Sequence, residues 1–137
     1  MERINDNALS ILNLEDDIMN LLKSEDDHFF LQLDSDDCDT SVLKVIKVEE
    51  HTGDQTKHLP IIENKDKTVR VKIGNVMHPM TNEHHISMIY LKTNQGGQFK
   101  ILSGLQAPIV SFELSENDVP LEVYGYCNLH GLWKETI

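Results

Sequence analysis

The feature that most constrains the fold is a succession of short β-rich runs, most of them in the C-terminal two thirds of the chain. In residues 69–74, branched apolar side chains alternate with polar residues or glycine, which is the pattern of a strand with one buried face. Glycine, proline and asparagine separate the later runs, which follow one another about every ten residues with no helical stretch between them. This series predicts a mainly β fold, an antiparallel β-sandwich. The other runs lie at residues 28–33, 42–48, 86–92, 98–102, 109–114 and 121–126.

The first 50 residues differ in composition from the rest and predict a separate region. They contain 14 acidic and 4 basic side chains, which accounts for nearly all of the net charge of −11. Apolar residues recur there at three- and four-residue intervals, and this spacing predicts an amphipathic helix over residues 7–23. We therefore expect residues 1–48 to form a small acidic N-terminal extension that contains this helix. The β-sandwich is expected over residues 49–137.

Composition and charge exclude several classes of function. No basic stripe is present to displace counterions, so nucleic acid is not expected as a partner. No stretch approaches the roughly 18 apolar residues that cross a bilayer, and the N-terminus lacks the pattern of a secretion signal. Two cysteines cannot form a disulfide framework, which favours the reducing cytoplasm. The acidic half is most simply a solvated surface, with a docking face for a partner as the alternative.

Five possible metal ligands lie in turns or at strand ends of the β region. They are His58, His78, His84, Cys127 and His130, and the last two form a Cys-x-x-His spacing. Each alone is a weak signal, because a histidine in a turn is usually a surface residue, but their joint occurrence favours a metal site. Structural zinc normally closes its shell with four ligands, whereas five ligands in a square pyramid leave one open position on an iron ion. An axial thiolate pushes electron density toward that position, which suits redox chemistry on a small oxygen species.

The remaining histidines and the second cysteine are not expected to bind metal. His85 adjoins His84 and would point to the opposite face of an extended chain. His28 and His51 lack a comparable neighbourhood, so we expect structural roles for them. Cys38 is most simply a reduced or partly buried thiol.

Residues 55–137 resemble superoxide reductase, the iron domain of neelaredoxin and desulfoferrodoxin. The resemblance implies an immunoglobulin-like β-sandwich of about seven strands. It also implies one mononuclear Fe(2+)/Fe(3+) centre with the four histidines equatorial and the cysteine axial. The implied enzyme reduces superoxide by one electron to hydrogen peroxide. The matching segments are Lys57–Pro60, His78–His84 and Cys127–Trp133.

The segment before the first histidine carries an implied catalytic residue and one departure from the family. By resemblance, Lys57 is the cation that attracts superoxide and helps to order the water that protonates the product; a solvated surface lysine is the alternative. Many family members carry a glutamate just before this lysine, which ligates the oxidised iron as product leaves. Thr56 stands there instead, which puts a carboxylate-capped ferric state in doubt.

The resemblance also implies partners and an origin for the N-terminal region. An external electron donor such as rubredoxin and a homodimer or higher homo-oligomer are expected. Two-centre members carry four cysteines in an N-terminal desulforedoxin-like domain. Residues 1–48 contain only Cys38, so a metal-free remnant of that domain is expected. The rival functions are a non-enzymatic iron-based redox or oxygen sensor and a metal-stabilised interaction module.

Overall fold

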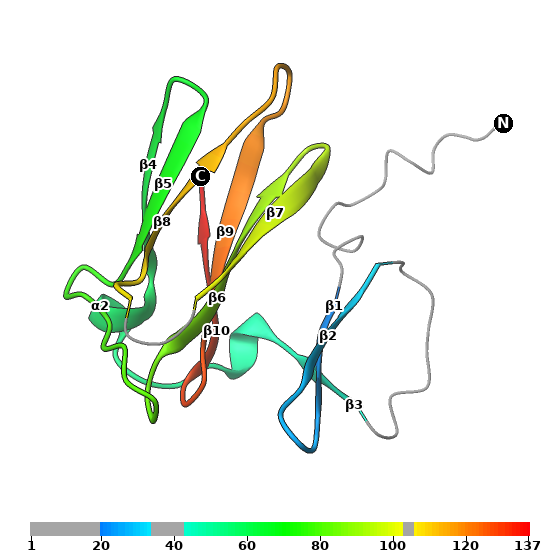
Figure 1. Cartoon of the computed structure of the whole chain (residues 1–137), viewed down its shortest axis with the longest axis vertical. Coiled ribbons are helices and arrows are strands. Elements are labelled where there is room, and N and C mark those ends of the chain that lie inside the picture. The colour runs from blue at the N-terminus through cyan, green and yellow to red at the C-terminus, as the bar shows by residue number, and fades with distance from the viewer. Residues whose placement is uncertain (1–19, 34–42, 103–105) are drawn as a thin grey trace, which may run out of the picture. The chain divides into compact units, whose positions relative to one another are not determined.

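The structure, a computed structural model, describes residues 20–33, 43–102 and 106–137 (Figure 1). The chain divides into two compact units, Met1–Ile46 and Lys47–Ile137. The described residues are mainly β, with two short helical segments, η2 (Val48–Glu50) and α2 (Gln55–His58). Among them, no helix has the length and apolar character needed to cross a membrane.

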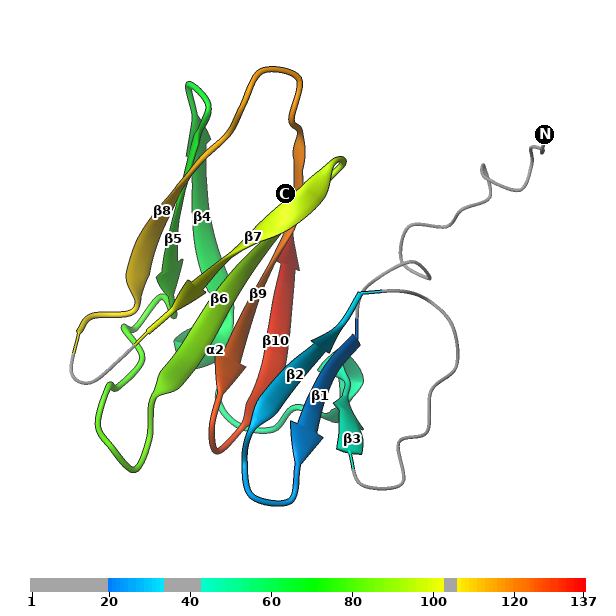
Figure 2. The same ribbon diagram turned by 45° about the vertical axis from the view of Figure 1, so that its right-hand side comes forward.

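The second unit is an antiparallel sandwich of seven strands in two sheets, which confirms the predicted fold class. One sheet has the strand order β4-β5-β8 and the other has the order β10-β9-β6-β7 (Figure 2). The strands are β4 (Pro60–Lys65), β5 (Thr68–Ile73), β6 (Ile86–Thr93), β7 (Gly96–Ile101), β8 (Ile109–Glu113), β9 (Pro120–Cys127) and β10 (Gly131–Thr136).

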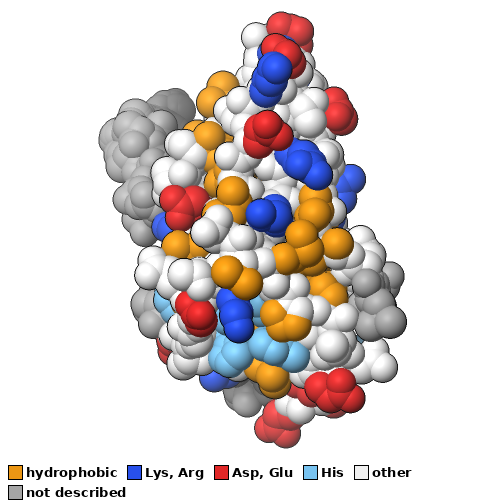
Figure 3. Space-filling model, turned by 90° about the vertical axis from the view of Figure 1, so that its left-hand side faces the viewer, with side chains coloured by type: hydrophobic (Ala, Val, Ile, Leu, Met, Phe, Trp, Pro, Cys, Tyr) orange, Lys and Arg blue, Asp and Glu red, His pale blue; other side chains and the backbone are white. Residues whose placement is uncertain are grey.

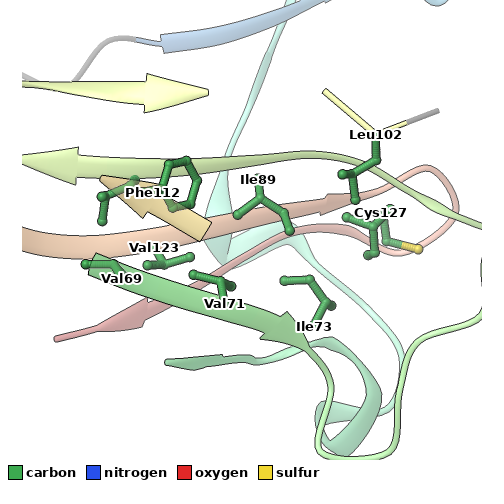
Figure 4. Close-up of a cluster of buried hydrophobic side chains, with 10 residues drawn as sticks. Val69, Val71, Ile73, Ile89, Leu102, Phe112, Val123 and Cys127 are labelled. Atoms are coloured by element: carbon green, nitrogen blue, oxygen red, sulfur yellow. The ribbon is translucent and has the colours of Figure 1, made fainter. Parts of the chain in front are cut away.

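The core lies between the two sheets and follows the alternation in the sequence. On β5, Val69, Val71 and Ile73 are fully buried, whereas the intervening Arg70 is exposed. They meet apolar side chains from β6 and β9 of the facing sheet and from β8 (Figure 4). Burial of this area is the main favourable term for the sandwich. The cluster consists of Val69, Val71, Ile73, Ile86, Ile89, Leu91, Leu102, Phe112, Val123 and Cys127.

The strand register brings several chain segments to one end of the sandwich. Pro60, the first residue of β4, pairs with Ile73, the last residue of β5. Cys127, the last residue of β9, pairs with Ile86 and with Gly131, which begin β6 and β10. The short helix α2, the loop between β5 and β6 and the turn between β9 and β10 therefore meet at this end.

The first unit is a three-stranded antiparallel sheet with the order β2-β1-β3. Its strands are β1 (Asn20–Ser24), β2 (Phe29–Gln32) and β3 (Leu43–Ile46). The helix predicted over residues 7–23 is wrong at its C-terminal end, and residues 1–19 lie outside the described part. Residues 20–24 instead form the central strand, whose main-chain groups pair with a strand on each side, and Leu22 is buried there.

Candidate metal centre

The five predicted ligands converge at the end of the sandwich where the loops meet. They come from α2 (His58), from the loop between β5 and β6 (His78 and His84), from the end of β9 (Cys127) and from the turn after it (His130). Ligand atoms of His58, His78, His84 and Cys127 all lie within 4.8 Å of one another. Nδ1 of His130 borders this group, 3.1 Å from Nε2 of His58 and 3.7 Å from Sγ of Cys127.

The four imidazoles form a closed square. The rings of His58 and His78 lie 4.7 Å apart between centroids, and those of His78 and His84 lie 4.6 Å apart. The separation is 5.0 Å from His84 to His130 and 4.8 Å from His130 back to His58. The diagonal from His58 to His84 is longer, at 6.4 Å. This arrangement differs from the tetrahedron of a structural zinc site.

Hydrogen bonds fix the tautomers of two of the four rings so that their lone pairs, not protons, face the centre of the square. Nδ1 of His58 donates to the carbonyl of Asp54 at 2.6 Å, and Nδ1 of His78 donates to the carbonyl of Pro79 at 2.7 Å. In the neutral rings, both Nε2 atoms then carry lone pairs, and yet they lie 3.2 Å apart. Nε2 of His84 is buried, with no hydrogen-bond partner among the described residues. A cation at the centre satisfies all three nitrogens, so the residues fit a metal ion.

Burial favours the neutral form of His58, His78 and His84. His58 and His78 are each only 2% exposed. Burial lowers the pKa of His78 from 6.5 to about 4, and it also lowers the pKa values of His58 and His84. Neutral imidazole is the form that binds metal. Imidazole suits iron, zinc and copper, and a neighbouring thiolate shifts the preference toward softer metals.

Cys127 is placed at the border between the core and the site. Its side chain is fully buried, and its sulfur points away from the apolar cluster toward the end of the sandwich (Figure 4). Burial raises the pKa of the thiol, while hydrogen bonds from the amides of Leu129 and His130 act in the opposite direction. Those amides stabilise a thiolate, and a bound cation would stabilise it further.

The segment before α2 closes one side of the site. Asp54 caps the helix, because its carboxylate accepts from the amide and the hydroxyl of Thr56 at 2.9 and 2.8 Å. These hydrogen bonds lower the pKa of Asp54. Gly53 has a φ of +104°, and a Cβ there would lie 2.9 Å from Cγ of His130 and 3.1 Å from Cε1 of His58. Glycine therefore allows the main chain to approach both rings.

Lys57 lies at the exposed side of the site. It precedes His58 in α2, its side chain is exposed, and its charge contributes to the lowered pKa of His84. The space-filling view shows a basic side chain against the exposed part of the histidine cluster, with apolar side chains around it (Figure 3). A positive charge at this place attracts small anions toward the metal position.

The other histidines lie outside the square. Nδ1 of His85 donates to the carbonyl of Thr81 at 3.0 Å, and His28 is exposed in the first unit. Cys38 falls outside the described residues. His51, for which sequence reasoning suggested no specific contact, stacks on Trp133 with ring centroids 3.7 Å apart, and Trp133 in turn stacks on His58 at 4.9 Å.

The metal-free protein is expected to lose stability as the pH falls from above 6.5 toward 4. The unfolded chain takes up a proton on His78 near pH 6.5, but the folded state holds this ring neutral down to about pH 4. The stabilising contribution is therefore complete above the unfolded pKa and is lost as the pH falls to the folded pKa. We expect a loss of at most about 3 kcal/mol from this residue.

Denaturant unfolding at several pH values checks this expectation. Fluorescence of Trp133, the one tryptophan of the chain, reports on the second unit. His78→Gln should flatten the pH dependence, whereas His28→Gln, at an exposed position of the first unit, should not. An identical slope in the His78 variant and the unmodified protein would contradict the prediction.

Comparisons with known proteins give one consistent family. Residues 50–136 match the Desulfoferrodoxin family. The chain is 41% identical over 89 residues to a desulfoferrodoxin of Syntrophotalea carbinolica, covering 64% of this chain and 69% of that protein. It is 37% identical over 98 residues to a superoxide reductase of Pyrococcus horikoshii, covering 59% of this chain and 85% of that protein.

One solved structure is similar over most of the chain. The superoxide reductase from Treponema pallidum has a TM-score of 0.73 and 36% sequence identity, covering 86% of this chain and 97% of that one. The second unit, Lys47–Ile137, makes up only two thirds of the chain, so this similarity includes part of the first unit.

Proposed function

Since this chain belongs to the desulfoferrodoxin family, we propose that it is a superoxide reductase, which reduces superoxide by one electron to hydrogen peroxide at one iron ion. The observation that carries the proposal is the convergence of four imidazoles on one buried thiol, in which the lone pairs of the buried His58 and His78 face each other. A simple hydrogen-bonded histidine cluster would place a proton between neighbouring nitrogens. The facing lone pairs of His58 and His78 leave no proton between them, and a cation at this place satisfies both.

We assign five side chains to the iron. His58, His78 and His84 would bind through Nε2 and His130 through Nδ1, because these are the nitrogens directed at the centre or next to it. Cys127 would bind as a thiolate. The square of imidazoles favours iron over the tetrahedral zinc of a metal-stabilised interaction module.

The iron supplies the single electron when it is bound, cycling between the ferrous and ferric states. The remaining work falls to the residues around it. Cys127 contributes electron density through its sulfur, and the amides of Leu129 and His130 limit that contribution by hydrogen bonding. The Lys57 ammonium attracts superoxide and orders water at the exposed side. Two protons from solvent complete the product, since superoxide, one electron and two protons give hydrogen peroxide.

The Thr56 substitution distinguishes this site from family members with a glutamate at that position. The nearby carboxylate, that of Asp54, caps α2 through two hydrogen bonds to Thr56. We propose that no carboxylate of this segment reaches the iron, so that the oxidised site stays accessible to solvent.

We propose the following partners, location and domain roles. An external one-electron donor such as rubredoxin restores the ferrous state, and the protein acts as a homodimer or higher homo-oligomer. A thiolate that must stay reduced favours the cytoplasm. Residues 1–48 are a metal-free remnant of a desulforedoxin-like domain, which the presence of a single cysteine there supports, and residues 49–137 form the iron domain.

Metal analysis and rapid mixing with superoxide test the proposal. Protein purified without added metal should contain one equivalent of iron. The ferrous form should be oxidised by stoichiometric superoxide with a rate constant approaching about 10⁹ M⁻¹ s⁻¹. One equivalent of zinc and no colour after oxidation would favour the interaction module. Iron that superoxide oxidises only slowly would favour the sensor.

A further inference from the structure

We propose that Asn128 is a positioning residue that fixes the separation of the two ligand-bearing segments around His84 and Cys127. The inference deepens the proposed function and rests on it, because that function makes His84 and Cys127 metal ligands. The contacts that carry it are all between protein atoms.

Asn128 makes three hydrogen bonds to one short segment. Its main-chain amide donates to the carbonyl of His85 at 3.1 Å. Its Oδ1 accepts from the amide of His85 at 2.8 Å, and its Nδ2 donates to the carbonyl of Glu83 at 3.0 Å. The segment between Glu83 and His85 contains His84, while Asn128 directly follows Cys127. Two ligands that lie 43 residues apart in the sequence are thus held by three bonds to one residue.

These bonds extend the β6–β9 ladder by one step. Ile86 pairs with Cys127 in the register, so His85 faces Asn128 one step beyond. A hydrogen-bonded antiparallel pair exchanges two main-chain bonds. Here one of them is made by the side-chain carbonyl of Asn128, which takes the place of its main-chain carbonyl. The side chain acts as a substitute peptide group.

This substitution has a consequence for the sulfur. The main chain after Asn128 does not continue the ladder and enters the turn to Gly131, whose φ is +94°. Within this turn, the amides of Leu129 and His130 reach the sulfur of Cys127. Asn128 therefore holds His84 in place and at the same time allows the turn that sets the hydrogen bonding of the thiolate.

Few residue types can do this. The amide group carries an acceptor and a donor in one plane, and both are used here. Aspartate keeps the acceptor for His85 but presents a carboxylate to the carbonyl of Glu83, so it should retain part of the function. Alanine removes both bonds. Each lost hydrogen bond lowers the free energy needed to open the turn, so the turn opens more often.

The first test measures the accessibility of Cys127 in metal-free protein of full length. Cys38→Ser serves as the background, so that Cys127 is the one thiol present. Asn128→Ala should increase the rate of reaction with a thiol-specific disulfide reagent about tenfold, and Asn128→Asp should increase it by a smaller factor. If the alanine variant does not fold, the aspartate variant decides the question, because it retains the bond to His85.

The chain offers a matched control at another position of the second unit. Asn94 also bridges two loops, since its amide donates to the carbonyl of Val119 at 3.0 Å and its Oδ1 accepts from the amide of Val119 at 2.8 Å. Asn94→Ala should leave the thiol reactivity unchanged. Equal reactivity of Asn128→Ala and the background, or an equal increase in Asn94→Ala, would overturn the proposal.

The second test uses the iron-loaded protein. Asn128→Ala should shift the sulfur-to-iron charge-transfer band and release iron to a chelator about tenfold faster, while Asn94→Ala should change neither. An unshifted band with unchanged iron release would also overturn the proposal. The proposed function is tested separately by the reaction of the unmodified protein with superoxide. If the unmodified protein does not react with superoxide, the proposed function fails, while the thiol measurement still decides the positioning role of Asn128.

Discussion

Replacing Cys127 with serine is expected to abolish the sulfur-to-iron charge-transfer absorption of the oxidised protein. The band requires a sulfur ligand, and a hydroxyl in the same place donates less electron density to the metal. The rate of superoxide reduction should fall by about a hundredfold or more, because the thiolate is the strongest donor among the five assigned ligands. Visible spectroscopy and rapid mixing with superoxide measure the two effects.

The serine variant should remain folded, which makes the result interpretable. Cys127 is fully buried, but serine is smaller, and its hydroxyl can accept from the amides that reach the sulfur. We expect a loss of about 1 kcal/mol in the free energy of unfolding. Cys38→Ser is the control and should keep both the band and the rate. An unchanged band in Cys127→Ser would reject this residue as a ligand.

Strands with alternating or long apolar runs were predictable, whereas strands with only two adjacent apolar residues were not. The alternation in β5 gave its position to within one residue, since alternate burial is what the pattern records. In β4 the two isoleucines are adjacent, and in β10 Leu132 and Trp133 are adjacent and both buried, so neither strand shows alternation. Both were missed for this reason. Both are edge strands.

The N-terminal region shows the limit of periodicity over a short window. The spacing of apolar residues up to Leu22 fits a helix, but β1 lies between two partner strands. Pairing with β2 and β3 depends on residues 29–46, which local spacing does not include. Tertiary context of this kind outweighs local propensity.

The convergence of the five side chains was expected from the sequence, but the tautomers of the histidines were not. Residue types and family resemblance suggested which five side chains to consider. The sequence could not show that carbonyls of Asp54 and Pro79 fix the ring orientation of two histidines, because a carbonyl is present at every residue. The contacts of His51 and Asn128 could not be predicted either, because they depend on residues far away in the sequence. A stacked ring or a side-chain amide becomes informative only when its neighbours in space are known.

Removing the charge of Lys57 is expected to slow the encounter with superoxide without changing the spectrum of the iron site. Lys57→Ala should lower the second-order rate constant about tenfold and make it less dependent on salt, because electrostatic attraction acts on the approach of the anion. Lys57→Arg should retain most of the rate. The measurement is rapid mixing of the ferrous protein with superoxide at several ionic strengths.

The control for Lys57 separates a local field from the net charge. Lys65 ends β4 at the hairpin with β5, opposite the end at which Pro60 lies beside α2, and Lys65→Ala changes the net charge by the same amount. This variant should react at nearly the unmodified rate. An equal loss of rate in both variants would show that overall charge steers superoxide, and no loss in Lys57→Ala would reduce this residue to a solvated surface lysine. A loss confined to Lys57 would mean that the position of a charge matters more than the total charge. A chain with a net charge of −11 can attract an anion only through such a local field.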